Sequence, residues 1–322
     1  MSLHHQEFFM FYNVENFYGP SELSSDVSHY QGDKYVKAQT WKYQNKLKKL
    51  SDVFELFKSE LGKMPIIFGL AEIQGERVLA DIKKLEILRD YLTIPIQHVD
   101  ERGMSTAFFY NPKSIEILSV YHHAFDSLSI DNQYFYENIS TRAVLQVTAK
   151  LGGEVIHFFL VHLPSKLKKK NHRPLIIKII AHLKSKISAL PQDEGVVIFG
   201  DFNMNPDEPL MLDLTIDKEF NKILTNSYSQ LYKNKLFSTF HKNEGLLYDQ
   251  FLISTHFEDE KFRVAFDSAQ IFSAEKLRVK TGKNLARPQR AYSGTRYIGG
   301  YSDHFPVILS VLIRKKEKEK KY

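Results

Sequence analysis

The tripeptide Ser302-Asp303-His304 places a carboxylate beside an imidazole, shortly before an apolar run that begins at Val307. Such a pair suits a site in which one side chain binds a metal ion and its neighbour transfers a proton. Asp-His pairs also arise by chance, and most of them are surface residues. This pair gains weight because other polar clusters lie upstream, each at the end of an apolar, strand-like run.

Two of these clusters come early in the chain. Asn13 and Glu15 close the apolar run 7–14, and alternate residues of an extended segment share a face. Glu72 follows the apolar run 65–71. Each cluster has a structural alternative, because Asn13 and Glu15 can form a polar turn, and Glu72 can precede a helix expected at 75–90, whose dipole favours an acid.

Three further apolar runs carry polar residues of the same kinds. His162 ends the run 155–161, where a buried structural histidine is the alternative. Asp201 and Asn203 follow the run 195–199 and again share one face. Asp249 lies in the otherwise apolar stretch 245–254, and because a buried acid is costly unless paired, we expect a partner such as a histidine.

Basic residues occur next to these clusters. Lys166 and Arg173 bound a basic loop before an expected helix, Arg142 opens an expected strand, and the stretch 273–298 is basic as well. Close to a catalytic site, such residues attract a polyphosphate backbone. Ordinary solvated charges, and a surface ion pair for Arg142, remain open as alternatives.

Composition limits the chemistry. The chain has 322 residues, 43% hydrophobic and 25% charged, and no run of about 18 apolar residues that would predict a transmembrane helix. It has no cysteine, which excludes disulfides, a thiol nucleophile and a thiolate zinc site. Oxygen and imidazole ligands therefore favour a hard cation, Mg²⁺ or Mn²⁺. The net charge of +6 weakly favours a polyanionic partner such as nucleic acid, and nothing indicates an obligate protein partner.

The organisation of the chain predicts a single domain over residues 1–313, followed by a charged tail at 314–322, since we find no internal repeat and no low-complexity linker. The residues 1–6 lack the basic region and apolar core of an export signal. We therefore expect a cytoplasmic protein, or a secreted or periplasmic one if the natural N-terminus is longer.

Together, the clusters form an ordered set of motifs. The motifs are Asn-Val-Glu-Asn-Phe (13–17), Leu-Ala-Glu-Ile-Gln (70–74), Val-His-Leu-Pro-Ser (161–165), Gly-Asp-Phe-Asn (200–203), Tyr-Asp-Gln-Phe-Leu-Ile-Ser (248–254) and Gly-Tyr-Ser-Asp-His-Phe-Pro-Val (300–307). In this order they resemble the endonuclease/exonuclease/phosphatase superfamily, which includes deoxyribonuclease I, apurinic/apyrimidinic endonucleases, deadenylases, sphingomyelinases and inositol polyphosphate 5-phosphatases. The first and last motifs resemble bacterial, nuclease-like members.

The resemblance implies a four-layer α/β sandwich, in which two facing mixed β-sheets are flanked by helices and the site lies at one end. It also implies a metal site. Glu72 would be the main ligand, with Asn13 and Asp303 nearby, and Glu15 would contribute to a second or alternative metal position.

The same resemblance implies catalytic roles. Asp201 would orient or deprotonate the attacking water, and His304, held by Asp249, would contact the scissile phosphate or act as the base. The division of this work between Asp201 and His304 stays open. The remaining phosphate contacts would come from Asn203, His162, Arg142, Lys166 and Arg173.

The substrate is the most open part of the interpretation. The Arg-Pro-Ala-Trp-Cys-Asp-Arg signature of the inositol 5-phosphatases is absent, and the loops 166–173 and 278–296 are basic, whereas a sphingomyelinase would expose apolar loops. We therefore expect a metal-dependent phosphodiesterase acting on DNA or RNA. A phosphatase or lipid phosphodiesterase of the same fold is the first alternative, and a non-catalytic nucleic-acid-binding module is the second.

Overall fold

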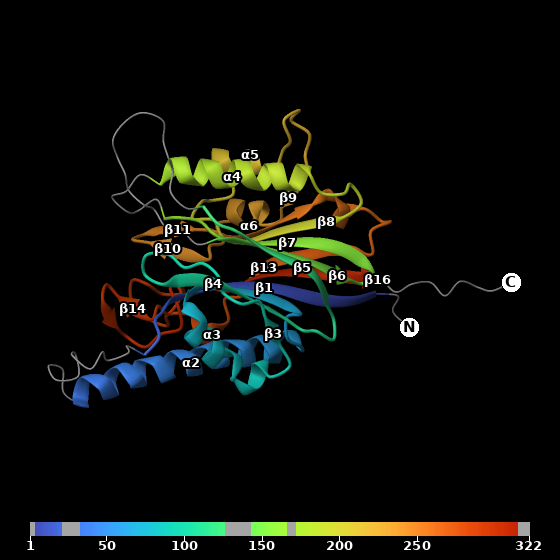
Figure 1. The fold of residues 1–322 in the computed structure, drawn as a ribbon. Coiled ribbons are helices and arrows are strands. Elements are labelled where there is room, and N and C mark those ends of the chain that lie inside the picture. Colours follow the sequence, from blue (N-terminus) through green and yellow to red (C-terminus); the bar gives the residue numbers. More distant parts are fainter. Residues whose placement is uncertain (1–3, 21–32, 126–142, 166–171, 315–322) are drawn as a thin grey trace.

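Two mixed six-stranded sheets pack face to face, with helices on their outer faces (Figure 1). A computed structural model describes residues 4–20, 33–125, 143–165 and 172–314. The architecture is the four-layer α/β sandwich that the family resemblance implies, so that expectation is confirmed. Within the described residues, every helix is too short or too polar to cross a membrane.

The first sheet has β1 and β2 at its centre. Its strands in spatial order are β13 (Val264–Ile271), β16 (Val307–Arg314), β1 (His4–Phe17), β2 (Ile67–Gln74), β4 (Met104–Tyr110) and β3 (Leu92–Thr93). Only the β1–β2 pair is parallel. The expected last strand thus runs one residue into the expected tail, and residues 315–322 lie outside the described part of the chain.

The second sheet has β7 and β8 at its centre. Its strands in spatial order are β5 (Glu116–His123), β6 (Val144–Leu151), β7 (Glu154–His162), β8 (Gly195–Asp201), β12 (Asp249–Ser254) and β9 (Leu224–Asn226). The β7–β8 pair is parallel and the other pairs are antiparallel.

Helices and short hairpins complete the described fold. The α-helices are α2 (Asp33–Leu61) and α3 (Gly75–Lys83) beside the first sheet, and α4 (Arg173–Ser188) and α5 (Pro209–Leu214) beside the second (Figure 1). The short helix α6 (Ser229–Lys233) packs on the core between the sheets. The 3₁₀ turns are η1 (Glu86–Leu88), η2 (Thr255–Glu258) and η3 (Glu275–Leu277), and the hairpins pair β10 (Thr239–His241) with β11 (Glu244–Leu246) and β14 (Tyr292–Ser293) with β15 (Arg296–Tyr297).

The expected helix 75–90 is shorter in the structure, because α3 ends at Lys83. Leu85 adopts an extended conformation with ψ of 129°, and the separate turn η1 follows it. The apolar spacing that predicted one helix therefore spans two short elements that pack on the same core.

Buried strands explain why the apolar runs are continuous. In β1, Phe9 and Phe11 face the core between the sheets, whereas Phe8 and Met10 face the core beneath α2 and α3. A third core lies between the second sheet and α4 and α5. Because both faces of β1 are covered, the strand has no alternating polar positions.

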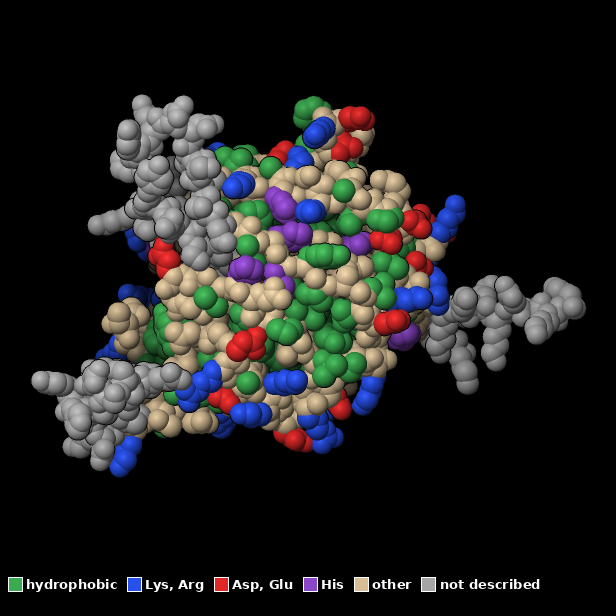
Figure 2. Space-filling model, in the orientation of Figure 1, with side chains coloured by type: hydrophobic (Ala, Val, Ile, Leu, Met, Phe, Trp, Pro, Cys, Tyr) green, Lys and Arg blue, Asp and Glu red, His purple; other side chains and the backbone are tan. Residues whose placement is uncertain are grey.

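The surface mixes apolar and charged side chains, and histidines gather near the middle of the face shown in Figure 2. At the carboxyl ends of β1, β2, β7 and β8, by contrast, polar residues are buried, among them Asn13, His162 and Asp201. Since buried polar groups require partners, this end of the sandwich is where a functional site is expected.

Candidate active site

Strand register brings three of the predicted residues into one row. His162 is the Cα partner of Asp201 across the parallel pair β7–β8, and Asp201 is the Cα partner of Asp249 across the antiparallel pair β8–β12. Directly paired residues of adjacent strands share a face, so these three side chains project together. The Nε2 atom of His162 lies 3.6 Å from Oδ2 of Asp201.

Gly200 makes this row possible. Its φ is +144°, and a Cβ atom there would lie 1.9 Å from the carbonyl oxygen of Val161 on the adjacent strand. Only glycine tolerates both the backbone conformation and the close approach. The Gly-Asp pair in the sequence therefore has a steric cause as well as a chemical one.

His304 reaches this row from the other sheet. It lies just before β16, and its Nδ1 atom is 2.7 Å from Oδ2 of Asp249. The same oxygen accepts a 2.5 Å hydrogen bond from the hydroxyl of Ser238, while Oδ1 of Asp249 is buried without a hydrogen-bond partner. The buried acid thus has the histidine partner that its apolar surroundings require.

Charge accumulates around this pair. Burial opposes protonation of His304, but the carboxylates of Asp249, Asp303 and Asp201 outweigh it, so the pKa of His304 lies well above its usual value. Burial, with help from Asp249, raises the pKa of Asp201 to about 7. Strong perturbation of several neighbouring groups is typical of a catalytic site.

Glu72 occupies a bulge in β2. Ala71 pairs with Thr106 and Ile73 pairs with Ser105, so Glu72 is the extra residue opposite β4. Its φ is +67°, it is partly exposed, and its Oε2 atom accepts a 2.6 Å hydrogen bond from the backbone N–H of Asn16. The bulge turns the carboxylate out of the ladder.

Unusual backbone conformations gather at the same place. Eight non-glycine residues of the described chain have positive φ, and four of them belong to the predicted motifs. These four are Glu15, Asn16, Glu72 and Asn203. Such conformations persist only where the surrounding structure imposes them, and they cluster at functional sites.

Asn13 joins the two halves of the site. Its Nδ2 atom donates a 3.1 Å hydrogen bond to Asp201, and its Oδ1 atom accepts one of 3.0 Å from the N–H of Glu15. The hydroxyl of Ser302 donates a 2.6 Å hydrogen bond to the carbonyl of Asn13, and Oδ2 of the next residue, Asp303, lies 3.7 Å from Nη2 of Arg290. Burial raises the pKa of Asp303, and Glu72 adds to this rise, against His304 and Arg290.

This donor set fits a hard divalent cation. Glu72 and Asp303 offer carboxylate oxygens and Asn13 a carbonyl oxygen, which are the ligand types of Mg²⁺ and Mn²⁺. Ligand atoms of Asp201, Asp249 and His304 also lie within 4.8 Å of one another. That group suits a metal less well, since Asp249 and His304 are already hydrogen-bonded to each other through one carboxylate oxygen and Nδ1.

Glu15 is placed differently from Glu72. Its Oε2 and Oε1 atoms accept hydrogen bonds from the N–H groups of Ala291, at 2.5 Å, and Tyr292, at 3.2 Å. Burial, followed by the charge of Asp303, raises the pKa of Glu15 to about 7. In this structure the carboxylate therefore holds the 291–292 segment against β1.

The other predicted phosphate contacts differ in their positions. Asn203 lies within the site, where Nδ2 donates a 2.8 Å hydrogen bond to the carbonyl of Leu163. Arg173 is an exposed residue that begins α4. Arg142 and Lys166 lie outside the described residues.

Some residues at the site were not predicted. Lys46 of α2 is buried, its ammonium group bonds to the carbonyls of Val14 and Glu15, and burial lowers its pKa to about 8. Because Lys46 is spaced three and four residues from the buried Tyr43 and Leu50, it lies on the apolar face of a helix. This spacing could have indicated a buried lysine from the sequence alone. Ser238, by contrast, has no signal in the sequence.

Two facing mixed sheets, with carboxylates, carboxamides and histidines gathered at one end, define the deoxyribonuclease I-like class of α/β sandwich. The model of the Endonuclease/Exonuclease/phosphatase family matches residues 8–314. The chain therefore belongs to this family of divalent-metal-dependent phosphoester hydrolases. No curated protein matches the sequence.

Solved structures of low sequence identity share the fold. D. rerio TDP2 complexed with a single-strand DNA product is 14% identical, with a TM-score of 0.60 over 95% of this chain and 98% of that one. An endonuclease/exonuclease/phosphatase family protein from Bacteroides thetaiotaomicron is 17% identical, with a TM-score of 0.60 and coverage of 98% and 100%. The mannosyl-6-phosphatase Bt3783 of the same species is 17% identical, with a TM-score of 0.59 and coverage of 95% and 99%.

Proposed function

We propose that this protein is a phosphodiesterase that uses Mg²⁺ or Mn²⁺ to cleave DNA or RNA by in-line attack of water. One observation carries the proposal: the imidazole of His304 lies between two acids, with Nδ1 2.7 Å from the buried Asp249 and Nε2 3.9 Å from Oδ1 of Asp303. Glu72 is near enough to Asp303 for its charge to raise the pKa of that acid. Hydrolysis of a phosphodiester requires both a metal ligand set and proton donors aimed at the phosphate.

The proposed metal ligands are Glu72, Asp303 and Asn13, with Glu15 available only if its hydrogen bonds to Ala291 and Tyr292 are exchanged for metal contacts. When bound, the ion would neutralise charge that develops on the phosphate oxygens. The hydrogen bond from Asn16 orients the Glu72 carboxylate.

The proposed proton chemistry follows from the hydrogen bonds. Asp249 binds Nδ1 of His304, and Nε2, which lies 3.9 Å from Oδ1 of Asp303 and beyond hydrogen-bond distance of it, is the atom that would contact a phosphate oxygen. Asp201 has Oδ1 fixed by the N–H of Asn203 and Oδ2 fixed by Asn13, so its carboxylate is oriented to accept a proton from water. His162, at 3.6 Å from Asp201, donates to the phosphate or the leaving oxygen.

Basic residues support a nucleic-acid substrate. Lys242, Lys283, Arg287 and Arg290 line a cavity that includes Asp303, and the chain carries a net charge of +6. A neighbour of the same fold, D. rerio TDP2, holds a single-strand DNA product. The second candidate is a phosphatase acting on a sugar phosphate, which is favoured by the likeness to a mannosyl-6-phosphatase.

A substrate panel with Mg²⁺ tests the proposal. Plasmid DNA, single-stranded RNA, duplex DNA with an abasic site, inositol phosphates and a hexose 6-phosphate are incubated with the protein, with and without EDTA. The proposal predicts strand cleavage that EDTA abolishes. Release of inorganic phosphate from the sugar phosphate alone would establish the phosphatase instead, and binding of nucleic acid without turnover would indicate a non-catalytic module.

A further inference from the structure

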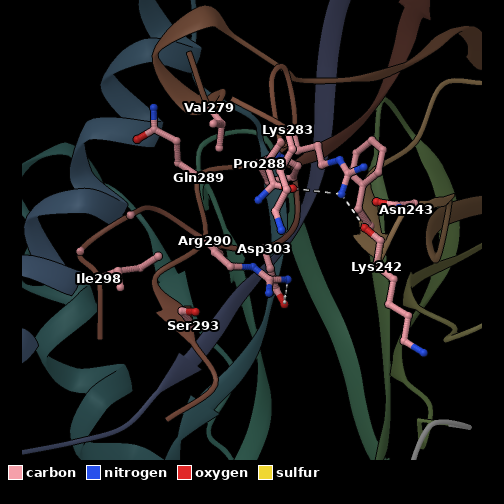
Figure 3. A pocket seen from close by; sticks show the side chains of 15 residues that line it. Lys242, Asn243, Val279, Lys283, Pro288, Gln289, Arg290, Ser293, Ile298 and Asp303 are labelled. Carbon is pink, nitrogen blue, oxygen red and sulfur yellow. Dashed lines mark hydrogen bonds and ion pairs between the residues drawn. The ribbon is translucent and has the colours of Figure 1, made fainter. Parts of the chain in front are cut away.

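A cavity of about 660 Å³ lies next to the proposed metal ligands (Figure 3). Its walls come from the β10–β11 hairpin and from the segments 279–290 and 293–300, and it includes Asp303. Figure 3 shows Arg290 directed at Asp303, whereas the side chain of Lys242 extends away from this pair and its carbonyl faces Arg287. Its volume lies within the range of ligand pockets, about 300–1,000 Å³.

The cavity is strongly cationic. Lys242, Lys283, Arg287 and Arg290 line it, whereas Asp303 is its one acidic lining residue among those the structure describes. Arg290 pairs with Asp303. Within the described part of the chain, no carboxylate forms an ion pair with Lys242, Lys283 or Arg287, so the positive charge of these three residues is not neutralised by an acid.

Arg287 is held in place before any ligand binds. One of its Nη atoms donates to the carbonyl of Lys242 and to Oδ1 of Asn284, the latter at 3.2 Å, and its guanidinium lies 5.0 Å from the centre of the Phe240 ring. The backbone of Val279 bonds to that of Arg287 at 2.8 Å. A fixed guanidinium loses little conformational freedom when it binds an anion.

We propose that this cavity binds a second phosphate group of the substrate while the scissile phosphate lies at Glu72 and Asp303. The inference rests on the proposed function and deepens it. Because Asp303 belongs to both sites, one molecule can contact both. The second phosphate is either that of a neighbouring nucleotide in a strand or one carried by a small bisphosphate, and the nucleic-acid strand is the source favoured here.

The test compares substrates that carry one or several phosphates. The double variant Lys242→Ala/Lys283→Ala removes two exposed cations for which the described structure shows no hydrogen bonds from the side chain. We expect its KM for a short oligonucleotide to rise about tenfold or more, with kcat unchanged, because each lost phosphate contact weakens binding uniformly. The KM for bis(p-nitrophenyl) phosphate, which has one phosphate, stays the same.

Two further variants sharpen the comparison. Arg287→Lys keeps the positive charge but removes the planar guanidinium group and its paired N–H donors, so it raises the KM for the oligonucleotide and not that for bis(p-nitrophenyl) phosphate. The matched control Lys218→Ala/Lys261→Ala removes two exposed lysines elsewhere and leaves both KM values unchanged. Equal changes with both substrates, or a control that behaves like the cavity variants, would overturn the proposal.

The source of the second phosphate is read from two arms. In the first, a neutral methylphosphonate replaces, one at a time, each linkage next to the scissile one in the oligonucleotide. At one position this replacement should raise the KM of the wild type but not that of the double variant, because the variant already lacks the contact. In the second, a hexose bisphosphate is compared with its monophosphate as a substrate. If the wild type prefers the bisphosphate and the double variant does not, the cavity is assigned to a small molecule. If the wild type hydrolyses none of these substrates with Mg²⁺, the proposed function itself fails, which is distinguishable from a failure of the cavity.

Discussion

Asp249 has one carboxylate oxygen in two hydrogen bonds and the other in none. At the scale of single residues, this pattern supports the proposed role of the acid, which is to orient His304. The bonded oxygen fixes His304, and Ser238 fixes that oxygen. The sequence allowed the pairing to be predicted, because an acid in apolar company requires a partner, but Ser238 lies in no motif and only the folded chain brings it near.

The substitution Asp249→Asn tests this role. An amide keeps the shape of the side chain but cannot stabilise the same tautomer and charge of His304, so kcat falls about a hundredfold or more while KM changes little. Steady-state kinetics on an oligonucleotide measure both constants. Asp193→Asn, which alters an exposed acid, is the control. Wild-type kcat in the Asp249 variant would mean that this acid serves only the core.

The types of residue at the site could be predicted from the sequence, whereas the contacts that each of them makes could not. The motifs contain Glu15 and Glu72 at equivalent strand ends, and the local sequence pattern does not separate their roles, which only the family resemblance distinguished. The structure gives Glu15 two backbone hydrogen bonds from the 291–292 segment and leaves Glu72 partly exposed with one. The difference depends on a contact across more than 270 residues, which local patterns cannot report.

At the scale of elements, β8 must pass very close to β7. The carbonyl of Val161 occupies the space that a side chain at position 200 would fill. Glycine at this position could be read from the sequence as a sign of close approach, whereas the early end of α3 could not, because the apolar spacing continues past Lys83.

Gly200→Ala therefore destabilises the protein. The clash with Val161 and the φ of +144° together lower the free energy of unfolding by about 3 kcal/mol or more. Urea unfolding measures the change. Gly62→Ala is the matched control, since Gly62 also has positive φ, at +80°, but nothing lies within 4 Å of the added atom, and it costs about 1–2 kcal/mol. Equal losses in the two variants would contradict the steric account.

Histidines on β5 and α4 predict a pH dependence of stability. Burial lowers the pKa of His122, His123 and His182, and neighbouring His98 and Lys186 add to the effect. A lowered folded-state pKa means that the unfolded chain binds protons more readily. The stabilisation is therefore complete above the unfolded-state pKa of about 6.5 and is lost as the pH falls through the folded-state values.

The variant His182→Leu keeps an apolar packing partner for Phe125 and cannot titrate. The urea midpoint of the wild type should fall between about pH 7.5 and about pH 5.5, and that of the variant should fall less. His241→Leu, at an exposed position, should keep the wild-type pH dependence. A smaller fall in the wild type than in His182→Leu would reverse the sign and refute the assignment.

At the scale of the whole molecule, each sheet carries part of the site. The first supplies Asn13, Glu72 and the segment with Asp303 and His304, and the second supplies His162, Asp201 and Asp249. Hydrogen bonds from Asn13 to Asp201 and between His304 and Asp249 cross from one half to the other. The four-layer architecture was implied by the family resemblance of the motifs, but the pairs that join the sheets depend on packing.

Loosening the core between the sheets should therefore remove activity together with stability. Phe199 is fully buried there, stacked on Phe251 at 5.1 Å, and Phe199→Ala costs about 3–5 kcal/mol. Activity and near-ultraviolet circular dichroism should then be lost at the same, lower urea concentration. Phe220→Ala, at a residue that is 82% exposed, should change stability by less than about 0.5 kcal/mol. Activity that persists after the sheets have separated would contradict a shared site.

The most direct test of the account is a Mg²⁺ titration of oligonucleotide hydrolysis by the wild type and by Glu72→Gln, with Glu60→Gln as an exposed control on α2. The account predicts a saturable dependence on Mg²⁺ in the wild type and in the control, and no hydrolysis by Glu72→Gln at any Mg²⁺ concentration, although its circular dichroism spectrum is unchanged. Equal rates of hydrolysis with Mg²⁺ and with EDTA, or a rate in Glu72→Gln equal to that of the wild type, would contradict the account.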